Sequence, residues 1–179
     1  MVSNEKHNEI RQRVIKMLDQ NKIVLTESEK ENIEVADFGL NDIENIGLQI
    51  ITYINTERVC AKELIMFPHQ TCPEHLHPTI DDIPGKEETF RCRAGNVFLY
   101  ISGVSTNAPS CKAPNEKYYT VWHEIELKPG EQYTLMPDTL HWFQAGKNGA
   151  IVSEFSTKNT DDADIFTDPN IIREPIRYN

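Results

Sequence analysis

Two histidines separated by a single residue stand in the segment EHLHP, and this spacing favours a pair of metal ligands. Residues two apart on a β-strand point to the same face, so His75 and His77 would present their imidazoles side by side. Glu88 follows His77 across a loop that contains Pro84-Gly85, and a hairpin there would return its carboxylate to the imidazoles. His141 opens the later segment HWFQA and supplies a third imidazole. We therefore predict that these four side chains meet at one divalent ion.

Three imidazoles and one carboxylate form a mixed nitrogen and oxygen site, which suits Mn²⁺, Fe²⁺, Co²⁺, Ni²⁺ or Zn²⁺. Water or substrate oxygens would complete the coordination shell. A lone histidine is more often a surface or core residue than a ligand, so the prediction depends on all four side chains together. The sequence does not choose among the ions, because several bind such a site well and cellular supply decides.

Helical periodicity is absent between residues 47 and 157, where short runs of β-branched and aromatic residues alternate with turn signals. The expected strands are LQIITYI (48–54), VCAKELIMF (59–67), CPEHLH (72–77), ETFRCR (88–93), VFLYIS (97–102), YTVWHEIEL (119–127), QYTLMP (132–137), HWFQA (141–145) and AIVSEFST (150–157). Breakers such as Ala94-Gly95-Asn96, Gly146 and Gly149 stand between them. Many short antiparallel strands in one domain indicate an all-β jelly roll or barrel.

Helices are expected only before the strands. From Ile10, apolar residues recur at i, i+4, i+7 and i+8 among charged neighbours, which predicts an amphipathic helix over residues 5–20. Thr26 and Glu29 have the spacing of a capping box, so a short second helix is expected before Ile33. Both helices would pack against the outside of the barrel.

The chain length of 179 residues fits one structural domain with a single core. Within it we expect a helical N-terminal extension over residues 1–46 and the barrel over residues 47–157. Residues 158–179 are polar and contain prolines, and we expect this tail to wrap the barrel without forming a domain of its own.

Composition excludes several classes of partner. The formal net charge is −10, and no lysine or arginine cluster interrupts the acidic background, so nucleic acid is not an expected partner. No apolar run is long enough to cross a bilayer, and the N-terminus lacks the apolar core of a signal peptide, which predicts a cytoplasmic protein without membrane contact. The four cysteines are scattered without a CxxC pair, which favours reduced, buried thiols.

The spacing of the predicted ligands resembles that of the cupin superfamily. Its first motif has the form HxH, a gap, Glu, six residues and Gly, which His75-Leu76-His77, Glu88 and Gly95 match here. Its second motif is matched by Gly130, Pro137 and His141. Two features depart from the general pattern, because the gap before Glu88 is longer than usual and the spacing from Pro137 to His141 is one residue shorter. The resemblance implies a cupin double-stranded β-helix, a jelly-roll barrel.

A narrower resemblance covers most of the chain and points to the D-lyxose ketol-isomerase family. The segments that carry it are VADFGLNDIENIGLQI (35–50), CAKE (60–63), TCPEHLHP (71–78), PGKEETFRCRAG (84–95), LKPGEQYTLMPDTLHWFQAG (127–146) and SEFSTKNTDDADIF (153–166). The resemblance implies a Mn²⁺-type divalent ion and a homodimer. It also implies isomerisation of D-lyxose to D-xylulose and of D-mannose to D-fructose.

Residue by residue, the metal ligands of this family fall on His75, His77, Glu88 and His141. Glu87 is adjacent to the predicted ligand, but strand alternation and the spacing to the glycine favour Glu88. The family's active-site lysine falls on Lys86 and its later catalytic glutamate on Glu154. Without the resemblance, Lys86 would be interpreted as a solvated loop lysine, and Glu154 could face outward.

Three further acidic residues are candidates for sugar binding. Asp162 and Asp164 lie in an acidic stretch that the resemblance to the family also covers. Glu74 precedes the first histidine and adds a polar group to the expected pocket wall.

The chemistry of an aldose–ketose isomerase agrees with these assignments. A divalent ion would polarise and orient the sugar oxygens, Glu154 would serve as a general base, and Lys86 would stabilise or protonate an oxygen. Enediol and hydride-shift routes both stay open at this point. Two other functions use a similar site: a cupin dioxygenase, which generally needs an apolar pocket, and a non-enzymatic sugar-binding cupin, which needs neither a base nor a proton donor.

Overall fold

Nine strands and four helical segments follow one another along residues 3–173, the part of the chain that this computed structural model describes. In chain order they are α1 (Asn4–Gln20), α2 (Glu27–Glu31), β1 (Glu34–Ala36), β2 (Leu48–Asn55), β3 (Cys60–Met66), β4 (Thr71–Leu76), β5 (Glu88–Ile101), η1 (Glu116–Tyr118), β6 (His123–Leu127), β7 (Gln132–Leu135), β8 (His141–Ser156), η2 (Asp161–Ala163) and β9 (Ile165–Phe166). No helix within these residues is long and apolar enough to span a membrane.

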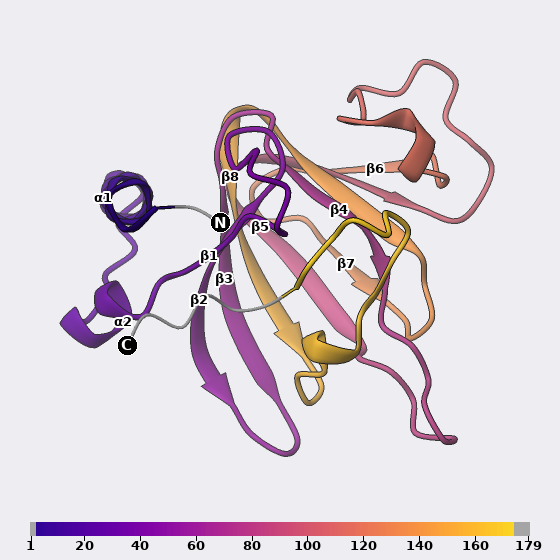
Figure 1. The fold of residues 1–179 in the computed structure, drawn as a ribbon, viewed down its shortest axis with the longest axis horizontal. Helices are drawn as coiled ribbons and strands as arrows, with labels where there is room; N and C mark the ends of the chain where they lie inside the picture. The colour runs from indigo at the N-terminus through magenta and orange to yellow at the C-terminus, as the bar shows by residue number, and fades with distance from the viewer. Residues whose placement is uncertain (1–2, 174–179) are drawn as a thin grey trace.

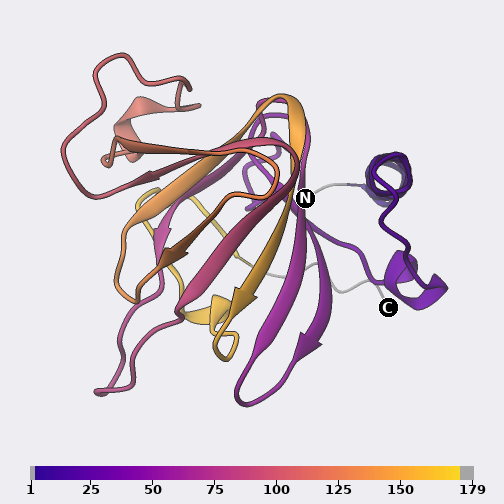
Figure 2. The ribbon, with the colours of Figure 1, turned by 180° about the vertical axis from the view of Figure 1, so that it is seen from behind.

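The strands form one antiparallel sheet that curls into a half-barrel, with α1 lying outside it (Figure 1). One path through the sheet runs β1-β2-β3-β8-β4-β9, and β5 pairs with β6, β7 and β8 beside this path. The reverse view shows the segment between β5 and β6 projecting on the side away from α1 (Figure 2). The predicted all-β architecture with helices outside is therefore confirmed, although β1 also adds a strand from the N-terminal extension.

Helix α1 forms where the apolar stripe predicted it. Ser3 begins the helix by accepting a hydrogen bond from the Lys6 backbone N–H, at 3.2 Å. Ile10, Val14 and Leu18 are fully buried in a cluster that includes residues of β2, β3 and β8. The outer face of the sheet thus binds α1 through apolar contact. The capping box of α2 is also present, with both of its reciprocal hydrogen bonds.

Strands β5 and β8 are longer than the sequence predicts, because the expected breaks at Gly95, Gly146 and Gly149 are bends within continuous strands. Register shifts in the β5–β8 pairing fall on both sides of Ala94-Gly95. Gly95 has a φ of +69°, and a Cβ atom there would overlap the carbonyl oxygen of Gly149. Glycine is therefore needed because the two strands cross closely while they turn. This bend allows both strands to pair along their length.

The expected strand over residues 119–127 is shorter than predicted and begins only at His123. The backbone N–H groups of Thr120 and Val121 donate to the carboxylate of Glu74 at 2.5 and 3.0 Å, so they are not available to a ladder. Nearby, the rings of Tyr100 and Trp142 stack at 4.0 Å between centroids and Tyr119 packs against them. Side-chain contacts thus replace strand pairing in this segment.

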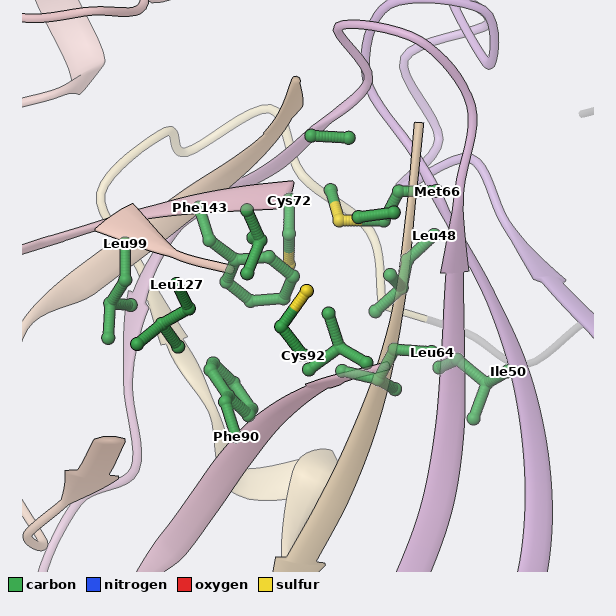
Figure 3. Close-up of a cluster of buried hydrophobic side chains, with 14 of the residues drawn as sticks. Leu48, Ile50, Leu64, Met66, Cys72, Phe90, Cys92, Leu99, Leu127 and Phe143 are labelled. Atoms are coloured by element: carbon green, nitrogen blue, oxygen red, sulfur yellow. The ribbon is translucent and has the colours of Figure 1, made fainter. Parts of the chain in front are cut away.

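The concave face of the sheet holds the main apolar core (Figure 3). Leu64 from β3, Phe90 and Cys92 from β5, and Phe143 from β8 are buried in it. All four cysteines are buried and free, as the sequence predicted. This core forms the floor beneath the predicted metal ligands.

Candidate metal centre and active site

Strand pairing brings the three predicted histidine ligands together. His75 on β4 is in register with His141 on β8, and His77 follows one residue beyond the end of β4. The ring centroid of His75 lies 4.3 Å from that of His141 and 5.0 Å from that of His77. Their ligand nitrogens all lie within 4.8 Å of one another, and all three residues are buried. This triad is a candidate metal site.

Glu88 completes the cluster from the first position of β5. Its Oε1 atom lies 3.1 Å from Nε2 of His77 and 3.3 Å from Nε2 of His141. Glu88 is buried, whereas Glu87 is exposed and uses its backbone N–H to donate to Thr157. The structure therefore places the four side chains of the predicted ligand set together, with the neighbouring carboxylate outside the cluster.

Each imidazole turns Nδ1 away from the cluster and Nε2 toward it. Nδ1 of His75 lies 2.8 Å from the carbonyl oxygen of Pro73, and Nδ1 of His141 lies 2.9 Å from that of Thr139. Buried Nε2 of His141 makes no hydrogen bond within residues 3–173. A buried nitrogen that lies 3.3 Å from a carboxylate oxygen and beside two imidazoles, yet makes no hydrogen bond within these residues, fits a coordination site for a divalent cation.

The electrostatics of the two neighbouring histidines differ. Burial and the nearby imidazoles lower the pKa of His75 well below its ordinary value. Burial also disfavours the charged form of His77, but the carboxylates of Glu88 and Asp164 outweigh it and raise the pKa of His77 to about 9. Both ring nitrogens of His77 face a carboxylate, with Nδ1 at 2.5 Å from Oδ1 of Asp164. A cation would therefore replace a proton on His77 when it binds.

Two lysines and two carboxylates lie directly beside the candidate metal site. Nζ of Lys86 lies 2.8 Å from Oε2 of Glu88, 2.9 Å from Asp161 and 3.3 Å from Glu154. Nζ of Lys62 lies 2.6 Å from Asp161 and 3.6 Å from Glu154. Lys86 and Glu154 thus face the cluster from a buried wall.

The carboxylates keep both lysines charged. Burial lowers the pKa of Lys86, but Glu154, Glu88 and Asp161 raise it well above its ordinary range. Burial likewise lowers the pKa of Lys62, but Glu154 and Asp161 outweigh burial and raise it above its ordinary value. At neutral pH both side chains are therefore ammonium groups that donate hydrogen bonds and accept none.

The remaining predicted site residues take different positions. Asp164 reaches the cluster through His77, whereas Asp162 is exposed. Glu74 is buried, but its carboxylate accepts hydrogen bonds from Thr120 and from Thr167, at 2.9 and 2.7 Å from the hydroxyls. Neither Asp162 nor Glu74 lines the cavity beside the histidines.

Sequence reasoning missed three charged residues that line this cavity: Lys62, Asp161 and Arg173. Lys62 occupies an inward position of the apolar strand CAKELIM, between Cys60 and Leu64, and this alternation was the available signal. Asp161 begins the acidic stretch in which the sequence predicts Asp162 and Asp164 as sugar-binding residues. No local pattern marks Arg173, whose guanidinium lies 3.7 Å from Asp161.

Comparisons with known proteins agree with the site. A family model described as D-lyxose isomerase matches residues 15–176. The D-lyxose/D-mannose isomerase of Thermosediminibacter oceani is 60% identical over 177 residues, which are 98% of each chain. The D-lyxose ketol-isomerase of Thermofilum sp. is 57% identical over the same share of both chains.

Solved structures with low sequence identity share the fold. The L-ribose isomerase of Acinetobacter sp. DL28, in complex with L-ribose, superposes with a TM-score of 0.78 at 14% identity and covers 95% of this chain and 94% of that chain. The L-ribose isomerase of Cellulomonas parahominis gives a TM-score of 0.76, with 97% and 96% coverage. Because the family model matches most of this chain and a relative is 60% identical to it, this chain belongs to the D-lyxose isomerase family.

Proposed function

We propose that this protein is a metal-dependent aldose–ketose isomerase that interconverts D-lyxose with D-xylulose and D-mannose with D-fructose. The observation that carries the proposal is the buried cluster in which three imidazoles and Glu88 meet a wall formed by Lys86 and Glu154. The names of the relatives at about 60% identity support the choice of sugars. The homodimer and the cytoplasmic location remain predictions.

Four side chains would hold the metal: His75, His77, Glu88 and His141. When bound, a divalent ion supplies Lewis-acid polarisation and a template for the sugar oxygens. We propose Mn²⁺, although the donor set also suits Fe²⁺, Co²⁺, Ni²⁺ and Zn²⁺.

Glu154 is the proposed general base. It would remove the proton from C2 of the aldose and deliver it to C1, while a second proton passes from the C2 hydroxyl to the C1 oxygen. The C2–H bond thus breaks first, the C1–H bond forms when the same proton is returned, and aldose becomes ketose without an external oxidant. The carboxylate is buried, lies 3.3 Å from Nζ of Lys86 and lines the cavity beside the histidines. Its position therefore suits a base that works on both carbons from one side.

Lys86 is the proposed stabiliser of negative charge on oxygen. Its ammonium stays charged at neutral pH, so it can donate a hydrogen bond to the oxygen that gains charge as Glu154 removes the proton. Because Lys86 contacts both Glu88 and Glu154, it lies between the ligand cluster and the base.

The polar wall favours a sugar over the substrates of the alternative enzymes. Lys62, Lys86, Glu154 and Asp161 line one side of the cavity, where a cupin dioxygenase would place apolar groups around its substrate. A sugar-binding module without activity would not need a buried lysine–glutamate pair next to its metal ligands. We therefore favour the isomerase over both alternatives.

The test is an assay of metal-reconstituted protein against a panel of aldopentoses and aldohexoses, with ketose formation as the readout. We expect turnover of D-lyxose and D-mannose. Glu154→Gln should lower kcat by about 10²–10⁴ with metal content unchanged, because it keeps the shape and removes the base. The exposed Glu87→Gln is the matched control and should keep wild-type turnover. No turnover of any aldose by fully loaded protein would contradict the proposal.

A further inference from the structure

The three imidazoles of the candidate metal site are held in place by two kinds of partner. Nδ1 of His75 and of His141 each face a backbone carbonyl two residues earlier in the chain. Nδ1 of His77 instead faces the carboxylate of Asp164, which lies 87 residues later. The local chain path therefore orients two of the rings, whereas the third depends on a distant side chain.

We propose that Asp164 is a positioning residue that orients His77 as a metal ligand, and that it does not bind the sugar. The inference rests on the proposed metal site. Asp164 would keep the proton of the neutral imidazole on Nδ1, so that the lone pair of Nε2 faces the ion. A carboxylate on Nδ1 also makes Nε2 a stronger electron donor than a backbone carbonyl does.

Strand β9 explains why Asp164 lies at this point. Its two residues pair with β4 in the register Leu76 with Ile165 and His75 with Phe166. Continued by one position, this antiparallel register sets Asp164 opposite His77. The Phe166 ring stacks on His75, with 5.3 Å between centroids and an interplanar angle of 28°. The short strand thus supports two of the three histidines at once.

Burial makes the Asp164 contact strong and leaves little of the carboxylate for another partner. The side chains of Asp164 and His77 are only 5% and 4% exposed. The contact joins an imidazole to a carboxylate, and hydrogen bonds with a charged partner are stronger than those between neutral groups. A sugar-binding carboxylate would present its oxygens to the ligand, whereas Oδ1 of Asp164 is directed at the imidazole.

The experiment measures metal affinity and does not depend on activity. Chelator-treated full-length wild type, Asp164→Ala, Asp164→Asn and Asp162→Asn would each be titrated with MnCl₂ by calorimetry. We expect Asp164→Ala to weaken Mn²⁺ binding by about 10–100-fold. Asp164→Asn should lose less Mn²⁺ affinity than Asp164→Ala, because its amide oxygen can still accept a hydrogen bond from Nδ1–H of His77. Asp162→Asn, an exposed neighbour in the same acidic segment, should bind like wild type.

A second measurement separates positioning from sugar binding. With saturating Mn²⁺, the KM of Asp164→Asn for D-lyxose should equal that of wild type. Unchanged Mn²⁺ affinity combined with a raised KM would overturn the inference and assign Asp164 to the sugar. If Asp164→Ala does not fold, the near-isosteric Asp164→Asn tests the inference through its Mn²⁺ affinity and its KM for D-lyxose. Wild type that binds none of Mn²⁺, Fe²⁺, Co²⁺, Ni²⁺ and Zn²⁺ in the same titration would instead overturn the proposed function itself.

Discussion

Replacing Gly95 with alanine tests whether the close crossing of β5 and β8 is what requires glycine. The backbone of Gly95 has a φ of +69°, so alanine would add strain of about 1–2 kcal/mol. Its Cβ atom would also overlap the carbonyl oxygen of Gly149 and lie 3.2 Å from Cα of Ala150. Backbone atoms cannot rotate away as a side chain can, and forcing the strands apart costs about 1–3 kcal/mol more. We expect a total loss of about 2–5 kcal/mol in the free energy of unfolding.

Gly130→Ala is the matched control, because Gly130 also has a positive φ, +93°. Apart from Gly130 and its two chain neighbours, no atom of residues 3–173 lies within 4 Å of the position that an added Cβ would take. Urea unfolding of both variants without metal, followed by circular dichroism, gives the two free energies. Strain alone would make Gly130→Ala the worse variant, since its φ lies further from the left-handed minimum near about +57°. The close crossing of β5 and β8 predicts instead that Gly95→Ala loses more stability than Gly130→Ala. A smaller loss for Gly95→Ala than for Gly130→Ala would refute this reasoning.

Three further predictions address burial, charge and metal. Gln49→Met should raise the free energy of unfolding, measured with urea, by about 1–2 kcal/mol. The Gln49 amide is fully buried and makes no hydrogen bond within residues 3–173, so a loss of stability would contradict this prediction. Asp161→Asn should destabilise the protein by about 3–5 kcal/mol and lower kcat, because it removes the carboxylate that Lys62 and Lys86 share. Wild-type stability of this variant in urea unfolding would argue against the shared contact. Excess chelator should lower the melting temperature, since metal that binds only the folded protein stabilises it; an unchanged melting curve would speak against a bound ion.

Local patterns in the sequence were sufficient for the parts of the site that follow strand geometry. The two-residue period placed His75 and His77 together, and the same alternation chose Glu88 over its exposed neighbour Glu87. The capping box at Thr26 also has its predicted structure. In each case the deciding contacts lie within a few residues of one another or within one strand.

The features that the sequence did not reveal depend on contacts between distant residues. Lys62 appears as an ordinary lysine within an apolar strand, because its partner Asp161 lies 99 residues later. Gly95 carries the local signal of a break, but pairing with β8 on either side continues the strand through it. Short-range patterns contain no information about such partners.

The position of Asp164 in the chain has a consequence for the newly synthesised protein. The ribosome adds His75, His77, Glu88 and His141 before it adds Asp164. At about 5–20 residues per second, roughly 1–5 s separate His141 from Asp164. During this interval the nascent chain contains the whole predicted ligand set but not the carboxylate that we propose orients His77. If Asp164 orients His77 as proposed, we expect tight binding of the ion only after this segment has been translated and β9 has paired with β4.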